Sequence, residues 1–232
     1  MRRFVRAVAV IAILALVSTP LAAQRCLGYA PFSAGNLRVG LNFTFPEQAK
    51  SYALEAAAGG DVGLYGAGQF GQIAINAGGG VIKILGFGAG YVIPIADGAR
   101  VALCPVAEIV FTSGPDVSQL VTSGRNATFG VAMGGVAASS PSLRLIPGLG
   151  AGFDLVPFTS LHFTNALSRR SQAGPDVDTD TNFWDVGIGA GLVFGKVITL
   201  RPSLVIPFGV SGAKTVLAIG LGFSFGEPEP DP

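Results

Sequence analysis

Charged residues are scarce in this chain of 232 residues. Lys, Arg, Asp and Glu together make up 12% of it, about half of their share in soluble globular proteins. Such a chain has little material for a hydrated surface. Histidine is scarcer still, with His162 as the single example. Without a histidine cluster or a CxxC motif, the sequence offers no metal or redox centre, and we expect no cofactor.

Long hydrophobic runs are also missing beyond the N-terminus, although 50% of the residues are hydrophobic. A membrane-spanning helix needs a run of about 18 apolar residues or more. The absence of such runs excludes a helical membrane protein, so membrane spanning would have to rest on β-strands.

The N-terminus has the pattern of a secretory signal peptide. Arg2, Arg3 and Arg6 precede the apolar stretch 7–17, and we expect cleavage after Ala23. Removal of residues 1–23 leaves 12 Lys+Arg against 14 Asp+Glu, a net charge of −2. No polybasic patch remains, which argues against nucleic acid as a partner.

Ten later stretches alternate between apolar residues and small or polar ones, with almost no charge in the apolar phase. Residues 143–155 illustrate the pattern, since Arg144 and Asp154 share the phase opposite to the leucines. The ten expected strands are residues 36–45, 51–58, 62–70, 81–95, 100–112, 125–138, 142–158, 181–194, 197–210 and 214–225. This pattern predicts an all-β fold, an antiparallel up-and-down transmembrane β-barrel of about ten strands. Eight strands are the alternative, if 51–58 and 62–70 form one interrupted strand.

The connections between these strands fall into two classes. Those after even-numbered strands are tight, whereas several after odd-numbered strands are long, the longest being 159–180. Tight turns at one rim and long loops at the other are typical of outer-membrane barrels. An even strand number then places both termini at the tight-turn, periplasmic rim.

The mature chain resembles the small outer-membrane barrels of Gram-negative-type bacteria, such as the OmpA transmembrane domain and OmpX. The most specific element is the last strand, where Gly220, Phe223 and Phe225 resemble the signal recognised by the barrel-assembly machinery. The chain departs from the family pattern in its strand number and in the acidic, proline-rich tail 226–232, for which we expect disorder. The resemblance implies an outer-membrane location, with membrane lipid and the assembly machinery as partners and a monomeric state.

Aromatic residues are expected in two girdles at the edges of the apolar band. The expected members are Phe43, Phe45, Tyr52, Phe111, Phe158, Trp184 and Phe208 at one edge, and Phe194, Phe223 and Phe225 at the other.

The two cysteines, Cys26 and Cys104, would both lie at the periplasmic rim. An exported chain meets an oxidising compartment, which favours a disulfide over two free thiols. Such a bond would hold the periplasmic N-terminal segment, residues 24–35, across the mouth of the barrel (residues 36–225) as a partial plug.

A set of charged residues has the phase expected for the lumen: Arg38, Glu55, Lys83, Glu108, Arg144, Asp154, Asp185, Arg201 and Lys214. We expect the three arginines in the periplasmic half, with the carboxylates and lysines in the outer half. These charges would either pair and close the lumen or line a narrow pore that selects solutes by charge.

The loop expected at 159–180 carries two weak signals. Asp176, Asp178 and Asp180 have the spacing that opens a calcium-binding loop, but the later ligand positions do not match. A solvated acidic loop, or weak bridging of divalent ions or lipopolysaccharide, is the simpler interpretation, and Arg169 and Arg170 could contact lipid phosphate there.

His162 lies in the same expected loop, with Ser160 and Ser168 nearby in sequence. This proximity alone does not make a catalytic triad. The sequence therefore favours a structural or surface-interaction role without enzymatic activity. A narrow solute channel is the alternative, and a lipid-modifying enzyme is the weakest of the three hypotheses.

Overall fold

The computed structural model describes residues 25–29, 37–46, 49–59, 63–75, 80–95, 101–114, 123–140, 152–170, 177–209 and 213–225. Its ten main strands are β1 (Leu37–Phe45), β2 (Ala49–Gly59), β3 (Leu64–Ile75), β4 (Val81–Tyr91), β6 (Val101–Ser113), β7 (Ser123–Gly135), β9 (Phe153–Arg170), β10 (Val177–Phe194), β11 (Ile198–Phe208) and β12 (Val216–Phe225). Two short strands, β5 (Ile93–Pro94) and β8 (Ala138–Ser140), pair with β6 and β9.

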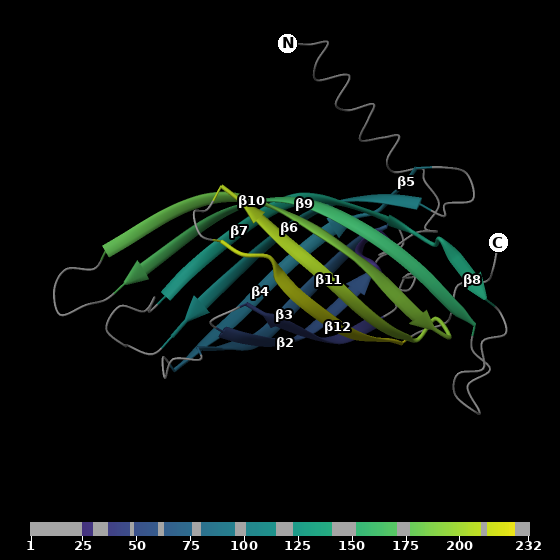
Figure 1. Ribbon diagram of the computed structural model, residues 1–232, viewed down its shortest axis with the longest axis horizontal. Helices are drawn as coiled ribbons and strands as arrows, with labels where there is room; N and C mark the ends of the chain where they lie inside the picture. The colour runs from purple at the N-terminus through teal and green to yellow at the C-terminus, as the bar shows by residue number, and fades with distance from the viewer. Residues whose placement is uncertain are drawn as a thin grey trace, which may run out of the picture.

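The strands form one closed barrel in which sequence neighbours are spatial neighbours (Figure 1). Every pairing is antiparallel, and β1 closes the ring against β12 from Leu37↔Phe225 to Phe45↔Leu217. The predicted ten-stranded up-and-down barrel is therefore confirmed. We call the end where β1 begins and β12 ends the termini end, and the opposite end the far end.

Side chains alternate between the lumen and the outer wall along each strand. On β1, Leu37, Leu41 and Phe43 are exposed while Arg38 and Gly40 are buried. The outer wall exposes large apolar side chains on all ten main strands. Three of them, Phe70, Phe129 and Ile188, are more than half exposed. The lumen carries glycine, alanine and polar residues. This distribution is the reverse of a soluble barrel, whose apolar residues face inward.

The seventh long strand differs from its prediction. We expected it at 142–158, whereas β9 covers Phe153–Arg170 and β10 begins at Val177. Most of the stretch interpreted as the loop 159–180 is thus part of a long hairpin, and residues 141–151 lie outside the described residues. The connection between β8 and β9, at the termini end, is longer than the tight turn expected there, so the predicted contrast between the two rims fails at this connection.

The β9–β10 hairpin shows where the apolar wall ends. Two aromatic pairs face outward on it, Phe153 with Phe194 and Phe163 with Trp184, with ring centroids 5.5 and 5.2 Å apart. The outward pairs between them are almost entirely apolar. From residue 153 to residue 163 a strand advances about 33 Å, which at a tilt of about 40° is a height of about 25 Å, the usual apolar band of an outer-membrane barrel.

Beyond Phe163 and Trp184 the outward face of the hairpin becomes polar. The amide of Asn165 donates to Asp180 (2.8 Å) and to Asn182 (2.9 Å), and Arg169 binds both carboxylate oxygens of Asp178 at 2.9 and 3.3 Å. The hairpin therefore extends past the apolar band at the far end. Within the described residues, no helix is long and apolar enough to span a membrane.

Candidate functional site: a plugged lumen

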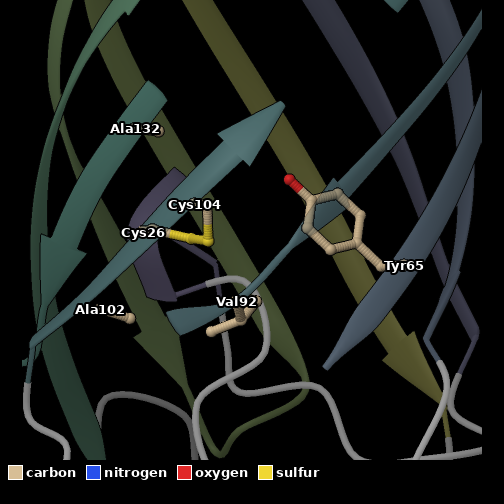
Figure 2. Packing of buried hydrophobic residues seen from close by; sticks show 6 residues of the cluster. All are labelled: Cys26, Tyr65, Val92, Ala102, Cys104 and Ala132. Atoms are coloured by element: carbon tan, nitrogen blue, oxygen red, sulfur yellow. A yellow bond between two sulfur atoms is a disulfide. The ribbon is translucent and has the colours of Figure 1, made fainter. Parts of the chain in front are cut away.

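The described N-terminal segment lies inside the barrel at the termini end. Residues 25–29, which we call the plug, begin with the 3-10 turn η1 (Arg25–Leu27) and contact β6, β7 and β9. Cys26 forms a disulfide with Cys104 of β6, and both residues are fully buried. Figure 2 shows this bond in the interior, with Tyr65, Val92, Ala102 and Ala132 around it. The predicted disulfide is confirmed, and residues 25–29 contact the inner wall, whereas 30–36 lie outside the described part of the chain, so the predicted span across the mouth stays a prediction.

Backbone contact between the plug and the barrel wall requires two glycines. Gly28 has a φ of +76°, and a side chain there would also overlap the ring of Phe158. On β10, a side chain at Gly191 would overlap the carbonyl oxygen of Gly28. Glycine at both positions lets the plug lie directly against the wall.

Tyr29 is held between two guanidinium groups. The Cζ atoms of Arg38 and Arg201 lie 3.6 and 4.5 Å from the centre of its ring. Tyr29 is 3% exposed, and burial raises the pKa of its phenol above the ordinary value, so the ring stays neutral. Cation–π contacts of this kind are strongest when the partners are desolvated.

The same two arginines belong to a network of polar groups across the lumen. Arg38 pairs with Glu55, and the other carboxylate oxygen of Glu55 accepts from the amide of Asn42 at 2.7 Å. Arg201 donates to the Asn42 side-chain oxygen (3.4 Å) and to the backbone oxygen of Leu27 (3.2 Å). The network therefore joins β1, β2 and β11 to the plug.

A second group of polar side chains lies further along the lumen. Gln69 donates to Glu108, the hydroxyls of Thr128 and Thr164 are 3.0 Å apart, and His162 Nδ1 is 3.0 Å from Asp185 Oδ1. These residues come from β3, β6, β7, β9 and β10. The inner wall thus carries polar contacts between nearby strands beyond the plug as well.

Several predicted lumen charges lie elsewhere. Lys83 faces outward with Val81 and Leu85 on β4, and Lys214 is exposed two residues before β12. Asp154 has the inward phase but lies at the termini end of β9, where it accepts from Ser139. Glu55 lies beside Arg38 rather than in the opposite half, so the predicted separation of positive and negative charge is wrong. Arg144 lies outside the described residues.

His162 and the aspartates are also not where the loop prediction placed them. His162 faces the lumen from β9, next to Asp185. Asp178 and Asp180 lie on strand β10 and bind Arg169 and Asn165, while Asp176 lies outside the described residues. Among the residues that the structure describes, no three His, Cys, Asp or Glu side chains gather into a metal site.

The aromatic girdles are outward-facing with one exception. Phe158 lies in the lumen, 9% exposed, with Arg201 5.6 Å from its ring centre. In the assembly signal predicted on β12, Phe223 and Phe225 face outward, while Gly220 faces Asn42 and Arg201. Sequence reasoning did not find Tyr29 or Asn42. The phase of Phe158, shared with Asp154, was the available signal for its inward position.

The solved structures named below are similar to the chain at low sequence identity. No family model matches the chain, and no curated protein does. The solved structures to which the chain is similar include three β-barrels. The N-terminal barrel domain of Pseudomonas aeruginosa OprF is 11% identical, with 83% of this chain and 98% of that one covered and a TM-score of 0.39. The KdgM porin is 9% identical, with 82% of this chain and 99% of that one covered and a TM-score of 0.42. The β-domain of the Bordetella autotransporter BrkA is 13% identical, with 83% of this chain and 99% of that one covered and a TM-score of 0.39. Similarity of this degree does not bear on function.

Proposed function

We propose that this protein is an integral outer-membrane barrel whose lumen is closed by its own N-terminal segment, and that it acts through its surface rather than as a channel. The observation that carries the proposal is the plug. Cys26 ties it to β6, Arg201 binds its backbone at Leu27, and Tyr29 lies between two arginines. These attachments, two of which share Arg201, lie inside one mouth and favour a closed barrel.

The apolar outer wall supports membrane insertion. The band between the two aromatic pairs of the β9–β10 hairpin has the height of an outer-membrane hydrocarbon core. The signal peptide expected at residues 1–23 supports export. The far end, with its extended hairpin, then faces the outside of the cell and supplies the interaction surface. We propose no catalytic role, and we assign His162 and Asp185 to the polar contacts inside the lumen.

Conductance across planar bilayers tests the closed state. The intact protein is expected to show no steady channel current, whereas Tyr29→Ala combined with Cys26→Ser should release the plug and produce one. A steady current through the intact protein would favour the alternative, a narrow solute channel. An epitope inserted between Arg170 and Val177 tests the orientation, since it should be detected on intact cells.

A further inference from the structure

The outer wall carries a continuous row of polar side chains towards the far end. Paired residues on adjacent strands carry the row from Tyr52 on β2 to Asp178 on β10. Its seven members, which we call the polar row, are Tyr52, Gln72, Lys83, Ser113, Ser123, Arg169 and Asp178. Seven consecutive strands thus present a polar group outward at one register level.

The next outward level, two residues nearer the termini end on each strand, is apolar over the first four of these strands. It consists of Leu54, Phe70, Leu85 and Phe111, each more than 40% exposed. The change from apolar to polar therefore happens within one side-chain level. On these four strands of a barrel in a membrane, this is the level at which acyl chains give way to headgroups, whereas on β9 and β10 the row lies beyond the apolar band.

Positive charge is concentrated in one part of this boundary. Lys83 belongs to the polar row on β4, and Arg125 on β7 lies one level below it, paired with Phe111. Both side chains are exposed. Among the described residues neither has an ion-pair partner, whereas Arg169 is bound to Asp178. Ser113 lies on β6 between the two cations, Ser123 lies on β7 one level above Arg125, and the two serines add exposed hydroxyl donors.

The spacing of these four groups suits a single phosphate. Adjacent strands are about 4.8 Å apart and residues rise about 3.3 Å along a strand, so Lys83 and Arg125, two strands and one level apart, start about 12 Å from each other on opposite sides of Ser113, within reach of one anion. Arg125 also lines a hollow of about 300 Å³ together with Ser123, Leu167, Arg169 and Asp178. A guanidinium binds phosphate through paired hydrogen bonds, and an ammonium adds a point charge.

We propose that Lys83, Ser113, Ser123 and Arg125 bind a phosphate on the headgroup of an outer-leaflet lipid. A lipid fits better than free phosphate, because the apolar side chains of Leu85 and Phe111 lie directly below Lys83 and Ser113, at the level of Arg125, and would contact the acyl chains. The carboxylates at the β10 edge of the row are held by Arg169 and Asn165, which limits the site to β4–β7. The choice of leaflet rests on the orientation proposed above.

The test is a titration of the full-length barrel in neutral detergent with diphosphoryl lipid A, followed by native mass spectrometry. Lys83→Gln and Arg125→Gln should each weaken binding about tenfold, and the double variant about a hundredfold. Lys50→Gln removes an exposed cation of the same rim on β2, outside the row, and should leave the affinity unchanged. Dephosphorylated lipid A should bind the unmodified barrel with the same reduced affinity that diphosphoryl lipid A shows for the double variant.

Unchanged affinity in the double variant, or an equal loss in Lys50→Gln, would overturn the proposal. If inorganic phosphate competes with lipid A and binds with equal affinity, the ligand of this site is a free anion and not a lipid headgroup. Arg125→Lys keeps the charge and should retain most of the binding, which separates loss of the site from loss of the fold. Detergent micelles have no sidedness and the assay does not use the lumen, so failure here is distinct from failure of the closed-barrel proposal.

Discussion

The carbonyl oxygen of Gly28 occupies the space that a side chain on Gly191 would need. This contact joins the plug to β10, separately from the disulfide to β6 and from the Arg201 hydrogen bond on β11. Closure of the barrel thus depends on a residue far from the plug in sequence.

Gly191→Ala should displace the plug. The added methyl group overlaps the backbone of Gly28, which a rotamer change cannot relieve, so we expect a loss of about 1–3 kcal/mol and, when measured in the Cys26→Ser background that removes the disulfide, channel current. The matched control is Gly68→Ala on the outer wall of β3, where the nearest atom to a new Cβ would be 3.9 Å away. Equal stability and silent bilayers for both variants would contradict the proposed contact.

Glu55→Gln should destabilise the barrel strongly. Arg38 is 2% exposed and pairs with Glu55, and removal of one partner of a buried ion pair costs about 3–5 kcal/mol. Urea unfolding in micelles, followed by the fluorescence of Trp184, measures the loss. The double variant Arg38→Met, Glu55→Leu removes both charges and should recover most of the stability. A double variant as unstable as Glu55→Gln would show that the charge pair is not the cause.

Ile188→Arg should impair insertion, because Ile188 is 52% exposed on the outer wall between the two aromatic pairs of the hairpin. An arginine at the bilayer midplane of a barrel costs about 2–4 kcal/mol, and near the interface about 1 kcal/mol or less. Asn182→Arg on the same strand lies beyond Trp184 and should be tolerated. Folding yield into lipid vesicles compares the two. Similar yields would mean that the two positions share one environment.

The sequence predicted the barrel because lipid on one side and the lumen on the other impose a period of two on every strand. It misplaced β9 because 143–155 and 153–163 alternate equally well. Beyond Phe163 the hairpin leaves the apolar band, so Asn165, Arg169 and Asp178 have the composition of a loop although they lie on strands. Local alternation does not show where a strand leaves the membrane.

Lys83 was misassigned for the same reason. Its phase matches Leu85, but a charge was expected to face the lumen. At the end of the apolar band the ammonium group of an outward lysine reaches the headgroups. It therefore avoids the free-energy cost of a charge among the acyl chains. The sequence could not predict the contacts of Tyr29 with Arg38 and Arg201, because these residues come together only when the barrel closes.

The most direct test of the lipid-facing wall uses Trp184, the single tryptophan of the chain. The protein is refolded into bilayers whose acyl chains carry bromine, and its fluorescence is compared with that in unbrominated bilayers and with iodide in the buffer. We predict strong quenching by bromine near the headgroup end of the chains and little quenching by iodide. Strong iodide quenching without a bromine effect would place Trp184 in water and contradict the account.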